Sequence, residues 1–136
     1  MSTPGNSSND RAARQRIPAD DLTTSTIVID ETTILAVAGI LDLLTAAAFQ
    51  DAVDSALDTR PAALIIDMSD VEFLASAGMA VLVNASRRAT DIPFAVVANG
   101  RATSRPIQLT GLDTVFELCG SREDALRICK DRLANP

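Results

Sequence analysis

The chain has 136 residues, a formal net charge of −6 and hydrophobic residues at 47% of its positions. This length suits one domain with its own core, and the acidic balance argues against binding to DNA or RNA, which requires a basic face. No apolar stretch approaches the roughly 20 residues of a membrane span and no signal peptide is recognisable, so we expect a cytoplasmic protein that binds neither nucleic acid nor membrane.

The first part of the chain is predicted to be an arm that precedes the folded domain. Residues 1–23 are rich in Ser, Asn, Pro, Gly and charged residues and show no regular hydrophobic period, which is typical of a flexible segment. The folded domain is expected at residues 24–136. It opens with two β-branched runs, at 26–30 and 33–38, whose short separation predicts a β-hairpin.

Helices and strands alternate after this hairpin. Phe49, Val53 and Leu57 recur at helical spacing and predict an amphipathic helix at 45–57, with Thr45 as its N-cap. Residues 62–68 are apolar on both faces, as expected of a central strand. The remaining predicted elements are a helix at 78–89, a strand at 94–98, a short helix at 104–110 closed by Gly111, an edge strand at 115–118 and a C-terminal helix capped by Ser121.

This order of elements predicts an α/β fold. It indicates a compact sandwich in which a mixed sheet of four to five strands carries about four helices. Loops at the carboxyl ends of parallel strands meet at one edge of such a sheet. The segments 39–42 and 73–78 each follow a strand, so we expect Asp42 and Ser76 to be neighbours.

Missing residue types exclude several classes of enzyme. The sequence contains no His, which removes the Ser-His-Asp triad and the usual imidazole metal ligand, and with them an esterase or amidase that uses Ser76. It contains no Tyr or Trp for stacking on nucleobases and no glycine-rich nucleotide-binding motif. We therefore expect a protein that is not an enzyme and that needs no cofactor or metal.

Ser76 is the residue whose position suggests regulation. It precedes Gly78 by two residues, where a helix is expected to begin. A phosphoryl group on this serine would lie beside backbone N–H donors and the positive end of the helix dipole. Ser is also a preferred N-cap, so the position is equally compatible with capping. The role of Asp42 is also left undecided by the sequence, because Asp42 can be an ordinary loop residue ahead of Thr45.

Two motifs resemble the STAS domain of bacterial anti-sigma factor antagonists. The first, G-x-L-D-x-x-T-A, is formed by Gly39, Leu41, Asp42, Thr45 and Ala46. The second, D-x-S-x-V-x-F-x-x-S-x-G, is formed by Asp67, Ser69, Val71, Phe73, Ser76 and Gly78. The resemblance covers about residues 25–133, and the segment 105–112 fits the short helix that precedes the last strand of the family.

The resemblance implies a partner-switching regulator. In that family the unphosphorylated antagonist binds an anti-sigma factor that is also a serine kinase, and this binding frees a sigma factor. Phosphorylation by the kinase breaks the complex, and a serine phosphatase restores it. The family's phosphorylated serine corresponds to Ser76 and its loop aspartate to Asp42. The partner-binding residues that the resemblance implies are Asp42, Ala75, Ser76, Ala77, Gly78 and Met79.

Departures from the family pattern keep a second function open. Ala75 and Ala77 stand where the family usually has Asp and a hydroxyl residue, and Ile40 stands where it often has Glu. Such a chain is also compatible with a constitutive antagonist, or with a STAS scaffold subunit of a larger signalling complex that is never phosphorylated. The pattern indicates no particular oligomeric state.

Three further residues have predicted structural roles. Cys119 and Cys129, without any His, fall short of a zinc site, and the place of Cys129 on the apolar side of the last helix favours a core role over a redox switch. Asp67 is predicted to end its strand and to organise the following residues by accepting hydrogen bonds from backbone N–H groups.

Overall fold

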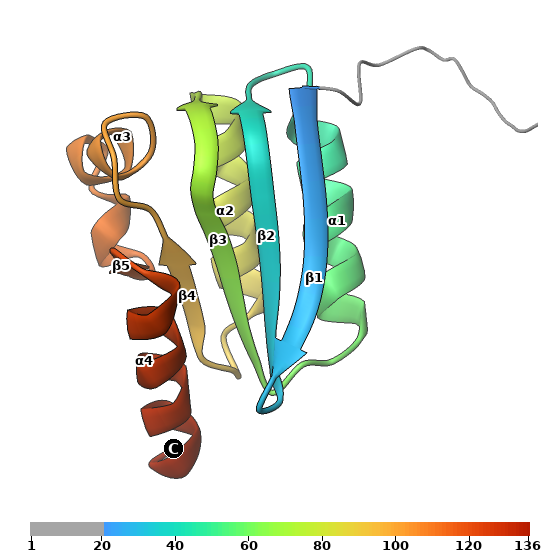
Figure 1. The fold of residues 1–136 in the computed structure, drawn as a ribbon, viewed down its shortest axis with the longest axis vertical. Coiled ribbons are helices and arrows are strands. Elements are labelled where there is room, and N and C mark those ends of the chain that lie inside the picture. The colour runs from blue at the N-terminus through green and yellow to red at the C-terminus, as the bar shows by residue number, and fades with distance from the viewer. Residues whose placement is uncertain (1–20) are drawn as a thin grey trace, which may run out of the picture.

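The computed structural model describes residues 21–136, which form a five-stranded sheet flanked by helices (Figure 1). The strands are β1 (Leu22–Ile29), β2 (Thr32–Leu41), β3 (Ala63–Leu74), β4 (Phe94–Val97) and β5 (Glu117–Cys119). The predicted arm lies outside the described residues except for its last three positions, and β1 begins at Leu22, inside the segment assigned to the arm. The flexibility of residues 1–20 therefore stays a prediction.

The sheet is mixed, as predicted. Its strand order is β1-β2-β3-β4-β5, with β1 antiparallel to β2 and the other neighbours parallel. The predicted hairpin is confirmed. Its turn is formed by Asp30 and Glu31, which both have positive φ, at 49° and 70°. Two successive positive φ angles match the twist of the flanking strands, although neither residue is the glycine that usually adopts them.

Helices cover both faces of the sheet, which confirms the predicted α/β sandwich. Helices α1 (Ala46–Asp58) and α2 (Ser76–Arg88) lie together on one face, behind the sheet in Figure 1, where Phe49 and Leu82 are fully buried in the larger core. On the other face α4 (Arg122–Ala134) packs over β3, β4 and β5 around a smaller core. The short helices α3 (Ser104–Leu109) and η2 (Leu112–Thr114) connect β4 to β5.

Strands β2 and β3 are longer than predicted. The pattern placed their ends at residues 38 and 68, whereas the structure extends them to Leu41 and Leu74. Val71 and Leu74 are buried and the two residues between them are exposed, so this part of β3 has one apolar face, and it pairs with the end of β2. The expected loops before Asp42 and Ser76 are therefore mostly strand. Two register shifts between β2 and β3, at Ala36/Ala38 and at Gly39/Ile40, accommodate the extension with one extra residue of β3 at each.

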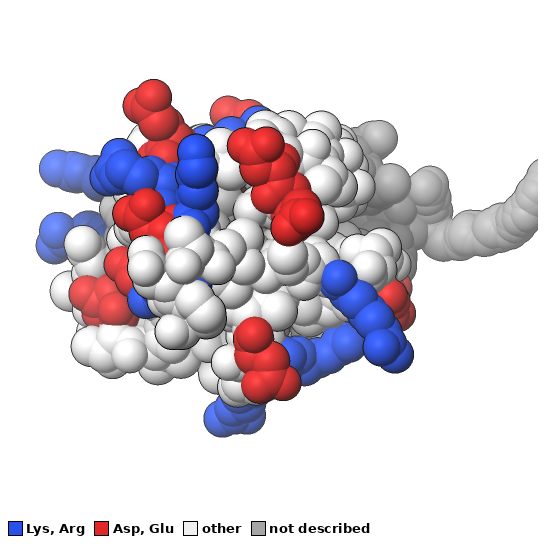
Figure 2. All heavy atoms as spheres, turned by 90° about the horizontal axis from the view of Figure 1, so that it is seen from below, with Lys and Arg blue, Asp and Glu red and all other residues white. Residues whose placement is uncertain are grey.

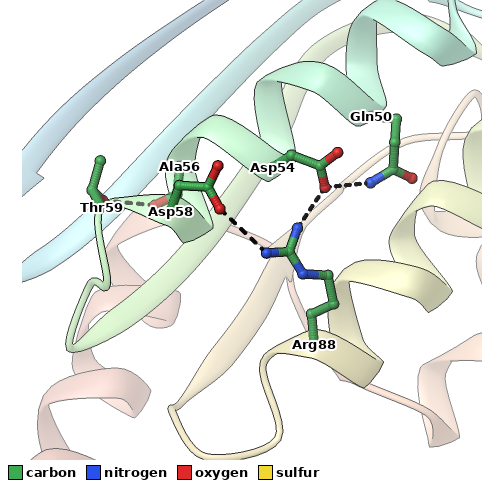
Figure 3. Close-up of polar contacts among 6 residues, drawn as sticks. All are labelled: Gln50, Asp54, Ala56, Asp58, Thr59 and Arg88. Atoms are coloured by element: carbon green, nitrogen blue, oxygen red, sulfur yellow. Dashed lines mark hydrogen bonds and ion pairs between the residues drawn. The ribbon is translucent and has the colours of Figure 1, made fainter.

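A polar contact near the C-terminal ends of α1 and α2 joins the two helices (Figure 3). The Arg88 guanidinium donates to a carboxylate oxygen of Asp54 at 2.6 Å and to one of Asp58 at 3.5 Å, and Gln50 donates to the same oxygen of Asp54. All three charged side chains are more than 40% exposed. Solvent screens such pairs, so we assign most of the α1–α2 stability to the apolar contacts beneath them.

The end of the molecule that carries the β1–β2 turn and the C-terminus of α4 has a mixed charge distribution. Figure 2 shows Lys and Arg side chains interspersed with Asp and Glu over this end. No continuous surface of one sign covers the part of it that the structure describes. Among residues 21–136, none of the helices has the length and apolar character required to cross a membrane.

Both thiols lie in the smaller core, between α4 and the sheet, and neither forms a disulfide. Burial raises the pKa of the Cys119 thiol, and burial together with the neighbouring Cys119 raises the pKa of Cys129 to about 11. The predicted core role of Cys129 is thus confirmed.

We expect both thiols to react slowly with the thiol reagent DTNB in the native protein, because both are buried and both have a raised pKa. With a pKa of about 11, Cys129 is on the order of 0.1% thiolate at pH 8. Unfolding the protein in guanidinium chloride should make both thiols react within minutes. Rapid stoichiometric labelling of the native protein would contradict this picture.

Candidate partner-binding site

The two motif segments meet at the carboxyl ends of β2 and β3. The backbone N–H of Ala75 donates to the carbonyl oxygen of Leu41 at 2.8 Å. Asp42 and Ser76 follow directly after the two residues that this hydrogen bond joins. The structure therefore brings Asp42 and Ser76 to the same edge of the sheet, at the carboxyl ends of β2 and β3, as expected for segments that each follow a parallel strand.

Asp42 holds the turn that leads into α1. One oxygen of its carboxylate accepts from the backbone N–H groups of Leu44 at 2.9 Å and Thr45 at 3.1 Å, and its carbonyl oxygen accepts from Ala46 at 3.0 Å. Helical hydrogen bonding therefore begins at Asp42, and its carboxylate does the work of a helix N-cap. Asp42 is half-buried, so part of its side chain remains accessible to solvent.

The prediction that the Thr45 side chain caps α1 is wrong. Thr45 stands at the N-cap position, but its hydroxyl makes no hydrogen bond to the first turn of the helix. It instead donates to the carbonyl oxygen of Ile40 at 2.7 Å and accepts from the N–H of Asp42 at 3.0 Å. The physical reason is that Thr45 already has helical backbone angles and is buried, so its side chain points back toward β2.

Ser76 is the first residue of α2, two residues earlier than the predicted helix start. Ala75 is the N-cap, with extended backbone angles, and no side chain caps this helix. The alternative that Ser76 is an N-cap is therefore wrong, because a cap side chain must come from the residue before the first helical one. Ser76 is exposed at the N-terminus of a 13-residue helix, where backbone N–H groups and the helix dipole favour a negative charge.

The position two residues after Ser76 has room only for a glycine. A Cβ on Gly78 would lie 2.8 Å from Cδ1 of Leu74 and 3.0 Å from Cβ of Leu41, so a larger residue would push the first turn of α2 away from the sheet. Gly78 is buried and contributes by positioning Ser76. The neighbouring Ala77 and Met79 are half-buried, and Met79 accepts a weak hydrogen bond from the Thr110 hydroxyl beyond α3, at 3.7 Å.

Three large apolar side chains are exposed at this edge. Leu43 is 81% exposed and Leu44 is 69% exposed in the Asp42 turn, and Phe73 is 53% exposed near the end of β3. We call these three residues the apolar rim. Phe73 belongs to a motif found in the sequence, whereas Leu43 and Leu44 occupy its unspecified positions and were missed. The sequence did contain a signal for these two residues, because they are adjacent leucines between a predicted strand and a predicted helix and belong to the buried positions of neither.

The comparison with known protein families identifies the chain. A family model of the STAS domain matches residues 23–125. The chain belongs to the STAS domain family. Its STAS domain is 40% identical over 108 residues to the anti-sigma-F factor antagonist RsfB of Mycobacterium tuberculosis, a match that covers 79% of this chain and 88% of RsfB.

Solved structures agree with this assignment. An anti-sigma factor antagonist from Mycobacterium paratuberculosis has a TM-score of 0.77 and 39% identity, with 82% of this chain and 97% of that chain covered. The Bacillus cell fate determinant SpoIIAA in its phosphorylated form has a TM-score of 0.58 and 16% identity, with 78% of this chain and 99% of that chain covered. At this low identity, the likeness to SpoIIAA shows the fold alone.

The charged residues of the two strand-to-helix segments and of the last part of β3 are acidic, whereas Arg101 and Arg105 follow β4 at the same end of the sheet. Asp70 and Glu72 are exposed on the last part of β3, and Asp42 is half-buried. The sequence has no Lys or Arg at positions 31–59 or 61–86, which include both strand-to-helix segments. A further negative charge on Ser76 would therefore add to carboxylates of the same sign.

Asp67 connects this part of β3 to α4. Its carboxylate accepts from the Ser69 hydroxyl at 2.6 Å, from the Ser69 N–H at 3.0 Å and from Nε of Arg122 at 2.9 Å, and its side chain is only 8% exposed. Burial alone would raise the pKa of Asp67, but these hydrogen bonds and the Arg122 charge together lower it below its usual value. The prediction that Asp67 ends its strand is wrong, because β3 continues to Leu74. The predicted hydrogen bond from the following backbone is present at Ser69, and the structure adds Arg122 as a partner.

Proposed function

We propose that this STAS domain is an anti-sigma factor antagonist that is switched by phosphorylation of Ser76. In the unphosphorylated form it binds a kinase-type anti-sigma factor through the edge formed by Asp42, the segment 75–79 and the apolar rim, and the anti-sigma factor then releases its sigma factor. The observation that carries the proposal is the exposed Ser76 at the start of α2, next to the Asp42 turn. The 40% identity to RsfB, a named anti-sigma-F factor antagonist, supports it.

The apolar rim provides the binding free energy in this proposal. Leu43 and Leu44 extend from a turn whose backbone is already held by Asp42, so little conformational entropy is lost when a partner covers them. Burying a leucine side chain fully contributes about 1.5–3 kcal/mol. Two leucines and Phe73 together are therefore sufficient anchors for a stable complex that excludes water from the Ser76 hydroxyl.

Phosphorylation would weaken the binding of the partner and would leave the fold of the STAS domain intact. Within the STAS domain the phosphate is well placed, because the N-terminus of α2 supplies N–H donors and a favourable dipole. Toward the partner, the phosphate adds roughly −1.5 to −2 charges beside Asp42 and the carboxylates of β3. An interface adapted to a neutral hydroxyl would have to desolvate this charge, so the modified domain dissociates while its fold persists.

The decisive experiment combines the full chain with each kinase-type anti-sigma factor of its source and ATP. Intact mass followed by peptide mapping should show one phosphoryl group, located on Ser76, together with dissociation of the complex. The variant Ser76→Ala should bind and remain unmodified, and a serine phosphatase should restore binding of the wild type. This role places the protein in the cytoplasm.

Binding without modification would contradict the switch. It would instead support a constitutive antagonist or a scaffold, the function for which Ala75 and Ala77 provide the specific observation, since neither offers a polar group to a kinase beside Ser76. Absence of binding to every kinase-type anti-sigma factor would reject the antagonist function itself.

A further inference from the structure

Strand β1 is the outermost strand on one side of the sheet, and its outer hydrogen-bonding edge is unpaired among the described residues. It lies at the end of the strand order and pairs only with β2 among the described residues, as the right-hand strand in Figure 1. Its eight residues, LTTSTIVI, include no charged residue and no proline, and all of them after Leu22 are exposed. The apolar side chains among them are Ile27, Val28 and Ile29, with exposures of 45%, 67% and 37%.

Within residues 21–136, this edge lacks the features that normally prevent strands from pairing between molecules. Soluble proteins protect an edge strand by making it short, by bulges, by prolines or by charged side chains, because its outward N–H and C=O groups are otherwise a template for another strand. The opposite edge follows this rule, since β5 has only three residues. In contrast, β1 is long, and its register with β2 is regular from Leu22 to Ile29.

A groove runs along the inner side of this edge. It has a volume of about 470 Å³ and is lined by Thr24, Thr26 and Val28 of β1 and by Ala52 and Ala56 of α1, among others. The side of α1 toward the groove carries small residues, which leave room for the side chains of another strand and for another helix. The edge strand and the groove therefore form one continuous uncharged surface.

We infer that β1 pairs antiparallel with β1 of a second copy of this chain, so that the two sheets become one continuous sheet. A second copy fits this edge because the same surface must face itself across a twofold axis, and β1 brings no like charges into opposition. Residues directly opposite each other in an antiparallel pair point to the same face. This requirement places the twofold axis beside one residue, and pairing of the whole strand from Leu22 to Ile29 makes that residue Ser25 or Thr26.

This dimer leaves the proposed partner-binding residues of each copy, at the carboxyl ends of β2 and β3, free. In an antiparallel pair the carboxyl ends of β2 in the two copies point in opposite directions, so the two Ser76 residues lie at opposite ends of the joined sheet. The inference does not depend on the proposed function. Dimer formation and binding of an anti-sigma factor are expected to be independent of each other.

The test uses two charge variants near the expected axis. In the full chain, Thr26→Lys and Thr26→Glu each place like charges opposite or diagonal to each other in a dimer, within the distance at which cross-strand pairs interact. By sedimentation equilibrium between about 5 and 500 μM, the wild type should be dimeric, and each variant should dimerise at least about tenfold more weakly, a change of about 1.4 kcal/mol. An equimolar mixture of the two variants should recover dimers, because opposite charges then face each other.

Matched controls are Thr90→Lys and Thr90→Glu, which place the same charges at an exposed position beyond the C-terminus of α2. Both should dimerise like the wild type. A wild type that stays monomeric over the whole range would overturn the inference, as would dimers that the Thr26 variants leave unchanged. Recovery of dimers in the mixed sample would exclude a contact elsewhere on the surface, since only a site near the twofold axis responds in this way.

Discussion

The variant Ser76→Glu is expected to bind the anti-sigma factor about 100-fold more weakly than the wild type, whereas Ser76→Ala should bind within about threefold of it. A hundredfold loss equals about 2.7 kcal/mol. This is within the cost of desolvating a charge that has no partner at an interface. Alanine removes the hydroxyl without adding charge or volume, so it preserves the surface that the partner is adapted to.

Isothermal titration calorimetry with the purified anti-sigma factor would measure both affinities. Thr90→Glu adds the same charge at the far end of α2 and should bind like the wild type, which separates a local effect from the overall charge of the domain. Glutamate is favourable at the first turn of a helix, so Ser76→Glu should remain folded. Equal affinities of the alanine and glutamate variants would reject Ser76 as the switch.

The second large effect is expected at Asp67. Replacing Asp67 with asparagine should lower the free energy of unfolding by about 3 kcal/mol at pH 7, because it leaves Arg122 without its carboxylate and weakens both hydrogen bonds from Ser69. Since Arg122 is 39% exposed and can recover some hydration, we expect the lower end of the range for a broken buried pair. Urea unfolding monitored by circular dichroism would measure the difference.

The effect at Asp67 should depend on pH in a defined direction. The hydrogen bonds and the Arg122 charge lower the pKa of Asp67 in the folded protein. A lowered pKa contributes stability that is fully present above the unfolded-state pKa of about 3.9 and is lost as the pH falls through the folded-state value. The difference in stability between the wild type and Asp67→Asn should therefore be constant from pH 7 to about pH 5 and should decrease below pH 4.

A matched control for this prediction is Asp113→Asn, at an exposed carboxylate in η2. It should change the free energy of unfolding by less than about 0.5 kcal/mol. A difference between wild type and Asp67→Asn that stays the same down to pH 3 would show that the carboxylate charge is not what stabilises this contact.

The order of elements was predictable because each element has a strong local pattern. The spacing of Phe49 and Val53 marks α1, and the continuous apolar run before Asp67 marks a strand buried on both faces. Gly111 has a φ of 78° after α3, and the Ser121 hydroxyl accepts from the N–H of Asp124 at the start of α4, as predicted from their residue types. These signals depend on neighbours within a few residues, which the sequence displays directly.

The caps at the candidate site were less predictable. Serine and threonine are good N-caps in general, but Ser76 is already the first residue of α2, and Thr45, at the N-cap position of α1, already has helical backbone angles. A shift of one residue moves a side chain from capping the helix to pointing away from it. The strand ends were also misplaced, because the pairing of Leu41 with Leu74 extends both strands and no pattern within either segment reveals it.

The sequence by itself determined the α/β order of this STAS domain, the motif that contains Asp42 and Ser76, and the absence of a histidine-based catalytic site, since these depend on residue types and local spacing. Only the tertiary structure decided that Ser76 is exposed, that Leu43 and Leu44 are exposed in the Asp42 turn at the same end of the sheet, that Arg122 binds Asp67 from 55 residues away and that β1 pairs only with β2 among residues 21–136. Each of these follows from contacts between distant segments. Such contacts are fixed by packing of the whole chain and leave no periodic signal in it.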